Sequence, residues 1–339
     1  MRLSELDYEL PSALIAQEPL ESRSDARLQV LDRSSGKLEY SRFYKLAGFL
    51  REGDLLVVND TRVIPARLIA CKESGGKIEL LLIRPLPESE GAWLSLLRSH
   101  RQIKEGTRLI LDSGHALRLL CYQRPGRAIV ASDDSKPLSE LLKESGLLAL
   151  PPYIRREVAA ADQDDYQTVY AEHQGAIAAP TAGLHFTPKL LAELAVSGIK
   201  VAALTNHIGP GTFAPLRCAA VEAHSMEAEW YKIPQASTAA IEHTRRTGAR
   251  VIAVGTSCVR ALESFAITGD TEGFSGLFIY PGFRFRLVDA MITNYHLPRS
   301  TVLALVMAFA GRETILRAYA DAIRHRMRFL SYGDAMLLV

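Results

Sequence analysis

From about residue 165 onward the chain alternates short apolar runs with longer helical stretches, and this alternation restricts its fold more than any other feature. Several apolar runs are typical of buried strands: residues 176–179, 199–204, 251–254, 277–280 and 288–293. Helices are expected between or after them, over residues 258–266, 300–310 and 313–329. Such alternation predicts a parallel or mixed sheet with helices on its faces.

A further helix is expected after residue 187, because both of its ends carry the usual signals. Thr187 is suited to the N-cap, Pro188 takes the first helical position, and Gly198 follows the last turn.

The preceding part of the chain has a different texture. From about residue 63 to 131, short apolar runs are broken by turn signals every ten or so residues, which favours an all-β barrel or sandwich. An apolar strand over residues 54–60 comes before it, and residues 147–154, with two prolines, form a rigid return path. We therefore predict an α/β fold, a mixed sheet flanked by helices, interrupted by an inserted all-β barrel. The predicted domains are 1–64 with 150–339 for the α/β catalytic domain and 65–149 for the barrel.

Composition excludes several protein classes. With 48% hydrophobic and 23% charged residues the chain is globular, and a net charge of +2 gives no strong positive field. The N-terminus lacks a signal peptide, and the longest apolar run, 302–310, is too short to span a membrane. The four cysteines have no C-x-x-C spacing and are expected to be reduced thiols, not zinc ligands. We expect a cytoplasmic protein.

Polar residues follow several of the expected strands. These segments are 59–62, 180–185, 205–212, 255–257 and 294–296. In open α/β sheets ligands bind beyond the carboxyl ends of the strands, so these segments form a candidate active site.

Three histidines, His185, His207 and His296, stand just past apolar strands. A neutral imidazole can act there as a general acid, as a general base or as a hydrogen-bonding group that recognises a ligand. The alternative is a capping or turn histidine, which is the favoured interpretation for the histidines at 100, 115, 173, 243 and 325.

Carboxylates at two other places leave alternatives open. Asp60 and Arg62 either pair with one another to fix a turn or grip a polar substrate. Glu227 and Glu229 alternate on an expected strand, facing either the site or solvent. The run 209–214 fits a loose G-x-G-x-x-A pattern, but no helix opens after it, so a nicotinamide site is not favoured.

Several long motifs resemble those of the S-adenosylmethionine:tRNA ribosyltransferase-isomerases of queuosine synthesis. They are GDLLVVNDTRVIPARL (53–68), YQTVYA…GAIAAPTAGLHFT (166–187), HIGPGTF (207–213), VIAVGTSCVRALES (251–264), YPGFRFRLVDAMITNYHLPRSTVLALVMAFAG (280–311) and RFLSYGDAML (328–337). The resemblance runs in order along essentially the whole chain.

This resemblance implies a reaction and its participants. The family transfers and isomerises the ribosyl group of S-adenosylmethionine onto 7-aminomethyl-7-deazaguanine in a tRNA anticodon, giving epoxyqueuosine and releasing adenine and methionine. The family fold is an α/β domain with a β-barrel insertion. S-adenosylmethionine is then a cosubstrate, tRNA is the partner, and no metal is expected. We expect a monomer.

Site residues follow from the matching segments. His185 and His207 are the expected acid and base, in undetermined order, and Asp60 or Glu229 would hold the cationic amine or sulfonium. The residues expected to bind the donor are Thr181, Gly183, Thr256, Ser257, Arg260, Asn294 and His296. Those expected to contact tRNA are Arg62, Arg98, Arg101, Arg155 and Arg156.

The chain departs from the family pattern at a few positions. Asn206 stands where the family usually has Leu, and Glu227 and Ala228 replace a family His and Ser. The basic R-P-x-K-R stretch of the family is read here as residues 98–102, RSHRQ. Two other functions stay open: an S-adenosylmethionine-dependent RNA methyltransferase, for which no Gly-rich loop with its acidic partner is found, and a non-catalytic RNA-binding module.

Overall fold

The computed structural model describes residues 1–213 and 216–339, which form two compact units. The first unit contains residues 1–62, 151–173 and 179–339, and the second contains residues 63–150 and 174–178.

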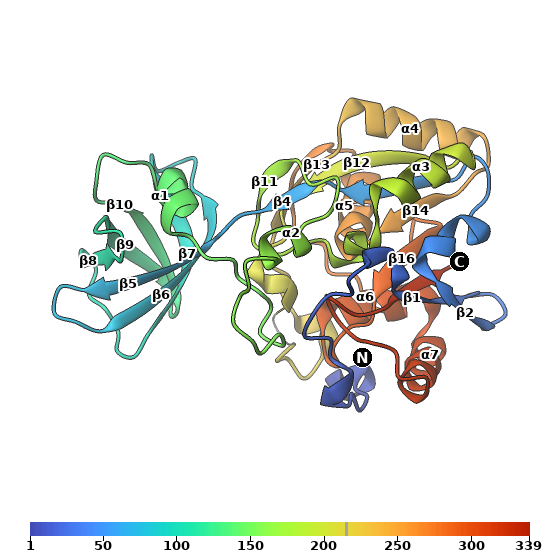
Figure 1. Ribbon diagram of the computed structural model, residues 1–339, viewed down its shortest axis with the longest axis horizontal. Coiled ribbons are helices and arrows are strands. Elements are labelled where there is room, and N and C mark those ends of the chain that lie inside the picture. Colours follow the sequence, from blue (N-terminus) through green and yellow to red (C-terminus); the bar gives the residue numbers. More distant parts are fainter. Residues whose placement is uncertain (214–215) are drawn as a thin grey trace. The chain divides into compact units, whose positions relative to one another are not determined.

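A nine-stranded mixed sheet is the centre of the first unit (Figure 1). Its strands lie in the order β15 (Glu272–Ser275), β13 (Glu229–Lys232), β12 (Lys200–Asn206), β3 (Leu55–Asn59), β14 (Val251–Val254), β16 (Ala290–Asn294), β17 (Ala335–Leu338), β1 (Arg27–Leu31) and β2 (Leu38–Arg42). The strands β12, β3, β14 and β16 are parallel, as are β17 and β1, and the remaining neighbours are antiparallel. The carboxyl ends of the central strands therefore share one edge.

Both faces of the central strands β3, β14 and β16 are buried, which explains why these strands read as continuous apolar runs. In β3, Leu55 and Val57 join one core cluster, whereas Leu56 and Val58 join another. The first cluster includes residues of α4 (Gln235–Arg246), α5 (Thr256–Thr268), α6 (Thr301–Ala310) and α7 (Arg312–Arg324). The second includes residues of α3 (Pro188–Val196) and of the 3₁₀ helices η4 (Phe43–Phe49) and η5 (Thr181–His185).

Short elements complete this unit. They are α2 (Asp162–Asp165) and the 3₁₀ helices η1 (Leu3–Leu6), η2 (Ser12–Leu14), η3 (Arg23–Asp25), η6 (Pro210–Phe213) and η7 (Val221–Ala223). A separate two-stranded sheet pairs β4 (Thr61–Val63) with β11 (His173–Ala176), and its residues are divided between the two units. No helix in the described ranges is long and apolar enough to cross a membrane.

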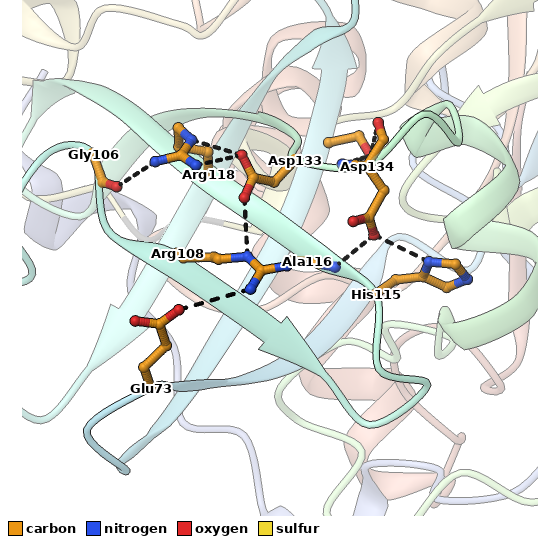
Figure 2. A network of polar contacts seen from close by, with 9 residues as sticks. Glu73, Gly106, Arg108, His115, Ala116, Arg118, Asp133 and Asp134 are labelled. Atoms are coloured by element: carbon orange, nitrogen blue, oxygen red, sulfur yellow. Dashed lines mark hydrogen bonds and ion pairs between the residues drawn. The ribbon is translucent and has the colours of Figure 1, made fainter.

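The second unit is a closed antiparallel barrel. Its strands follow the order β10 (Arg127–Ser132), β7 (Ala92–Ser99), β6 (Lys77–Pro85), β5 (Arg67–Lys72), β8 (Arg108–Leu111) and β9 (Ala116–Arg124), with α1 (Leu138–Ser145) packed against its core. An acidic pair after β10 ties neighbouring strands together (Figure 2). Asp133 accepts hydrogen bonds from Arg108 and Arg118, and Asp134 accepts from the backbone of Ala116 and contacts His115 at 3.1 Å.

The predicted fold class, a mixed sheet with flanking helices and an all-β barrel insertion, is confirmed. Thr187 caps α3 by accepting from the backbone N–H of Leu190, as its sequence position predicted. Two expected strands are wrong. Of residues 176–179 only Ala176 is in a strand, because the pairing with β4 takes place upstream in β11. Residues 277–280 are irregular, and the strand lies upstream as β15. The reason is that Ser275 bonds to Ser264 of α5 and ends the pairing with β13, so the apolar side chains after it pack on the core without a strand partner.

Candidate active site

A cleft opens at the edge where β12, β14 and β16 end. Its empty space is about 790 Å³, counting the part open to solvent. Segments that follow strands and the first residues of two helices supply its lining. The lining residues are Tyr153, Ala179, Pro180, Thr181, Ala182, Ile208, Thr212, Glu229, Gly255, Thr256, Ser257, Arg260, Thr293, Asn294, His296, Leu297, Ser300, Val302 and Leu330.

The N-terminus of α5 faces this cleft through Gly255, Thr256 and Ser257. Gly255 has φ of 94°, a conformation that favours glycine, and it lets the chain turn directly from β14 into the helix. Among the described residues, no side chain caps this helix. The first N–H groups of a helix have no acceptor within it and carry partial positive charge, so this end suits an anionic group.

The N-terminus of the second helix, α6, is capped by a side chain. Ser300 caps α6 by accepting from the backbone N–H of Leu303 at 3.2 Å. The two helix starts on the cleft are therefore unequal, and α5 offers the freer donors.

A buried ion pair forms one wall of the cleft. Arg260 of α5 donates to Glu229 of β13 at 2.7 Å, and both side chains are more than nine-tenths buried. Glu229 also accepts from the N–H of Gly209 and the hydroxyl of Thr212, at 3.0 and 2.8 Å. The remaining Arg260 nitrogens donate to the carbonyls of residues 275 and 277. This pair therefore fixes the loop after β12 against α5.

Asn294 reaches the cleft from the end of β16. Its Nδ2 atom lies 3.2 Å from His185 Nε2 and donates to the carbonyl of Leu330 at 3.1 Å, whereas its buried Oδ1 atom has no partner among the described residues. Leu330 takes the left-handed conformation, φ 71°, which a leucine adopts only under constraint from its surroundings. The amide is thus oriented with an unused acceptor.

His185 lies behind Asn294 and does not line the cleft. Its ring packs on Phe43 with centroids 5.0 Å apart, and only 4% of the residue is exposed. Burial lowers its pKa to about 4, so the imidazole is neutral at physiological pH and Nε2 can accept from Asn294. His296, by contrast, lines the cleft, contacts Thr293 Oγ1 through Nε2 at 2.8 Å, and has its pKa lowered to about 3 by burial.

A second polar cluster lies at the ends of β3 and β12. Asp60 is buried and accepts from the hydroxyl of Thr205 at 2.7 Å, and burial raises its pKa. His207 Nδ1 lies 2.8 Å from the hydroxyl oxygen of Thr61, and burial, with a smaller effect of His173, lowers its pKa to about 4. These groups can exchange or orient protons. They lie next to the cleft, because Asn59, the residue before Asp60, donates to the cleft residue Ser257 of α5 at 3.3 Å.

The same cluster contains one group of side chains with metal-ligand chemistry. The ligand atoms of Asp60, Glu172 and His173 lie within 4.8 Å of one another, and two of the three residues are exposed. Exposed acidic groups commonly gather without an ion, so this group by itself assigns no metal.

Comparison with known proteins decides the family. The family model described as queuosine biosynthesis protein matches residues 3–338. This chain belongs to the queuosine biosynthesis protein family.

Members of this family resemble the chain over its full length. An S-adenosylmethionine:tRNA ribosyltransferase-isomerase of Geobacter sulfurreducens is 48% identical over 345 residues, which cover all of both chains. One of Thermotoga maritima is 46% identical over 342 residues, again covering both chains completely. The crystal structure of S-adenosylmethionine tRNA ribosyltransferase from Thermotoga maritima matches with a TM-score of 0.57 and 37% identity, covering 99% of this chain and 100% of that one.

Against this queuosine-family background, the residues expected to bind the donor can be located. Most of them line the cleft: Thr181, Thr256, Ser257, Arg260, Asn294 and His296. Glu229, expected as an electrostatic group, lines it too, but its partner is Arg260. Gly183 is not in the lining; a Cβ there would lie 2.2 Å from the Tyr170 hydroxyl oxygen, so close packing explains this glycine. His185, His207 and Asp60 surround the cleft without lining it.

The cleft also contains polar and apolar residues that the sequence did not single out, among them Tyr153, Thr293, Ser300 and Leu330. Ser300 carried a usable signal, since a serine before an apolar helix predicts an N-cap. Tyr153 carried none, because only the folded return path brings it here, where its hydroxyl contacts that of Ser331 at 2.7 Å.

The expected tRNA-binding arginines differ in their contacts. Arg62, Arg98, Arg101 and Arg155 are exposed. Arg156 instead makes a bidentate pair with buried Asp162 at 2.6 and 2.7 Å and donates to the carbonyl of Gln17. Burial would raise the pKa of Asp162, but hydrogen bonds from Arg156, Ala159 and Tyr332 outweigh it and lower that pKa.

Some local expectations need correction. Arg62 does not pair with Asp60 among the described contacts; it donates to the carbonyl of Ala171. Glu227 precedes β13, so it does not alternate with Glu229 on a strand. It packs against Gly211: a Cβ atom built on Gly211 would lie 2.8 Å from the Cβ atom of Glu227. Of the expected run 209–214, residue 214 lies outside the described residues.

Proposed function

We propose that this chain transfers the ribosyl group of S-adenosylmethionine to 7-aminomethyl-7-deazaguanine in tRNA and isomerises it, yielding epoxyqueuosine with release of adenine and methionine. The observation that carries the proposal is the cleft at the strand ends, combined with full-length relatives named S-adenosylmethionine:tRNA ribosyltransferase-isomerases.

The donor fits the chemistry of the cleft. Its carboxylate is anionic, and the uncapped start of α5 at Thr256 and Ser257 offers backbone donors with partial positive charge. Its ammonium and adenine amino groups are donors, and the unused Oδ1 of Asn294 is an acceptor. Thr181, Arg260 and His296 complete the donor site in this proposal.

The sulfonium supplies much of the reactivity. It makes methionine a good leaving group and acidifies the neighbouring 5′ hydrogens of the ribose. The protein must take such a proton, protonate the departing adenine, and hold the amine of the acceptor base while the bonds change. A positioned proton-transfer group is typically worth about 10² to 10⁴ in rate.

The acid and base roles belong to neutral histidines and a carboxylate in this proposal. His207 and Asp60 form the proton-handling cluster at the ends of β12 and β3, with Asp60 also holding the cationic amine. His185 acts through Asn294, the cleft residue that its Nε2 atom contacts. Glu229 acts through Arg260 and the loop after β12.

In this proposal the protein is a monomeric cytoplasmic enzyme that uses no metal. Its partner is tRNA, which is bound by Arg62, Arg98, Arg101 and Arg155. Arg156 has a structural role in this proposal, because it pairs with Asp162.

Product analysis tests the proposal against its rivals. The protein is incubated with S-adenosylmethionine and tRNA bearing the aminomethyl precursor, and the small products are separated and identified. Adenine and methionine in equal amounts, formed only with that tRNA, support the proposal. S-adenosylhomocysteine as the main product would establish a methyltransferase, and tRNA binding without turnover would leave a binding module.

A further inference from the structure

Three aromatic residues occupy neighbouring positions across the last strands of the large sheet. The ring of His207 stacks on that of Trp230, with centroids 4.9 Å apart and planes 24° from parallel. Trp230 of β13 is directly opposite Phe274 of β15 in the strand register. We call His207, Trp230 and Phe274 the aromatic row.

The aromatic row is on the face of these strands that the helices leave open. Along β13, Glu229 and Tyr231 are buried, with Glu229 paired to α5, whereas Trp230 and Lys232 are more exposed. On β15, Phe274 is 57% exposed and Ser275 is buried against Ser264 of α5. A large aromatic exposed on an edge strand is a liability for stability and aggregation, so it calls for a functional reason.

The row is continuous with the active-site region. His207 directly follows β12, and its Nδ1 atom lies 2.8 Å from the hydroxyl oxygen of Thr61. The next residue, Ile208, lines the cleft. Arg62, the residue after Thr61, is exposed in β4 and adds a cation that can meet a phosphate in this part of the chain.

We propose that the aromatic row is a stacking platform for an unpaired base of the RNA substrate, next to the base that is modified. This inference rests on the proposed function for the identity of the RNA. Unpaired bases are recognised by stacking on aromatic side chains, and such stacking tolerates many sequences because every base has a π face. Anticodon-loop bases adjoining the modified one are the unpaired bases within reach of the cleft.

A second copy of the chain is the competing occupant, and the edge strand argues against it. β15 has only four residues, and Glu272 at its start is held in an ion pair with Lys232 at 2.9 Å. Short, charged edge strands are poor templates for pairing with another strand. The exposed ring, not the strand edge, is therefore the recognition element.

The first test uses fluorescence. The chain has two tryptophans, and Trp93 is in the barrel, so Trp93→Phe leaves Trp230 as the sole indole. An anticodon stem-loop with an unpaired loop should quench this emission, and a fully paired RNA of equal length and charge should not. Equal quenching by both RNAs, or none by either, would overturn the proposal.

The second test separates binding from chemistry in the full-length enzyme. Phe274→Ala should raise the KM for tRNA by about fivefold to a hundredfold, as expected for loss of one base–aromatic stack, with kcat little changed. Phe274→Trp should retain the wild-type KM, whereas Phe274→Leu, which stays apolar, should behave like the alanine variant. Val196→Ala, at a residue 91% exposed on α3, is the matched control.

The outcomes distinguish this inference from the proposed function. An unchanged KM in Phe274→Ala would overturn the platform while leaving product formation intact. If wild type releases no adenine, the proposed function fails, and the quenching experiment still decides whether the row binds unpaired RNA. If Phe274→Ala instead abolishes concentration-dependent self-association in sedimentation and leaves RNA binding unchanged, the row is a protein interface.

Discussion

The Nδ2 atom of Asn294 lies 3.2 Å from Nε2 of His185, a contact that connects an amide in the cleft to a buried imidazole that does not line it. The neutral imidazole accepts from Asn294, and the amide oxygen is left without a partner among the described residues. His185 and the carbonyl of Leu330 therefore hold the amide in this orientation together.

This relationship predicts coupled effects of two substitutions. Asn294→Ala and His185→Ala should each raise the KM for S-adenosylmethionine by about tenfold to 150-fold, the range of one lost hydrogen bond to a charged ligand. His185→Gln, which keeps an acceptor, should recover part of the loss. In the Asn294→Ala background, His185→Ala should add little. Fully additive effects in this double-mutant cycle would show that His185 acts independently.

The same histidine predicts a pH dependence of stability. Burial lowers its pKa to about 4, compared with 6.5 in an unfolded chain. Between these values the unfolded chain binds a proton that the folded chain does not, so the folded state loses stability as the pH falls from about 6.5 toward 4. One such group contributes a slope of about 1.4 kcal/mol per pH unit. Urea unfolding at several pH values should show a shallower slope for His185→Gln; equal slopes would refute a buried neutral imidazole.

The pair of Glu229 and Arg260 predicts a strong effect on stability. Glu229→Gln should lower the free energy of unfolding by about 3–5 kcal/mol, because it leaves the buried guanidinium without its counter-charge. Glu229→Gln combined with Arg260→Met should cost less than the sum of the two single changes. The measurement is denaturant unfolding with all four proteins, and simple additivity would mean that the pair is not coupled.

The arginines expected to contact tRNA should fall into two groups: exposed ones that bind RNA, and Arg156, which stabilises the fold. Arg62→Ala and Arg155→Ala should each flatten the log–log salt dependence of tRNA binding by about 0.7, the value for one phosphate on a single strand. Arg156→Ala should leave that slope unchanged and instead lower the stability by about 3 kcal/mol, because buried Asp162 loses its partner. Lys189→Ala, at an exposed residue of α3, is the control. A flattened slope in Arg156→Ala would assign that residue to the RNA.

Local signals in the sequence were enough to predict much of the fold. Thr187, Pro188 and Gly198 bracket α3 because caps act over a few residues, and the cleft residues Thr256, Ser257 and Asn294 follow strands whose apolar runs are visible. Residues 277–280 were misread as a strand because apolar side chains do not reveal whether a pairing partner exists.

Relationships between distant segments could not be predicted in this way. The position of His185 behind Asn294 depends on Phe43, and that of Glu229 depends on Arg260, 31 residues away. The aromatic row depends on the register of β13 against β15, which the sequence does not display. Each of these features is set by tertiary packing.

The central claim is that the ribosyl group of S-adenosylmethionine, and not its methyl group, moves to tRNA. Two samples of the donor, one labelled with ¹³C in the ribose and one in the methyl group, are each incubated with the protein and precursor tRNA, and the digested nucleosides are analysed by mass spectrometry. The account predicts that the ribose label enters the modified nucleoside of the tRNA and that the methyl label leaves in methionine. Methyl label in the tRNA, with ribose label retained in S-adenosylhomocysteine, would contradict it.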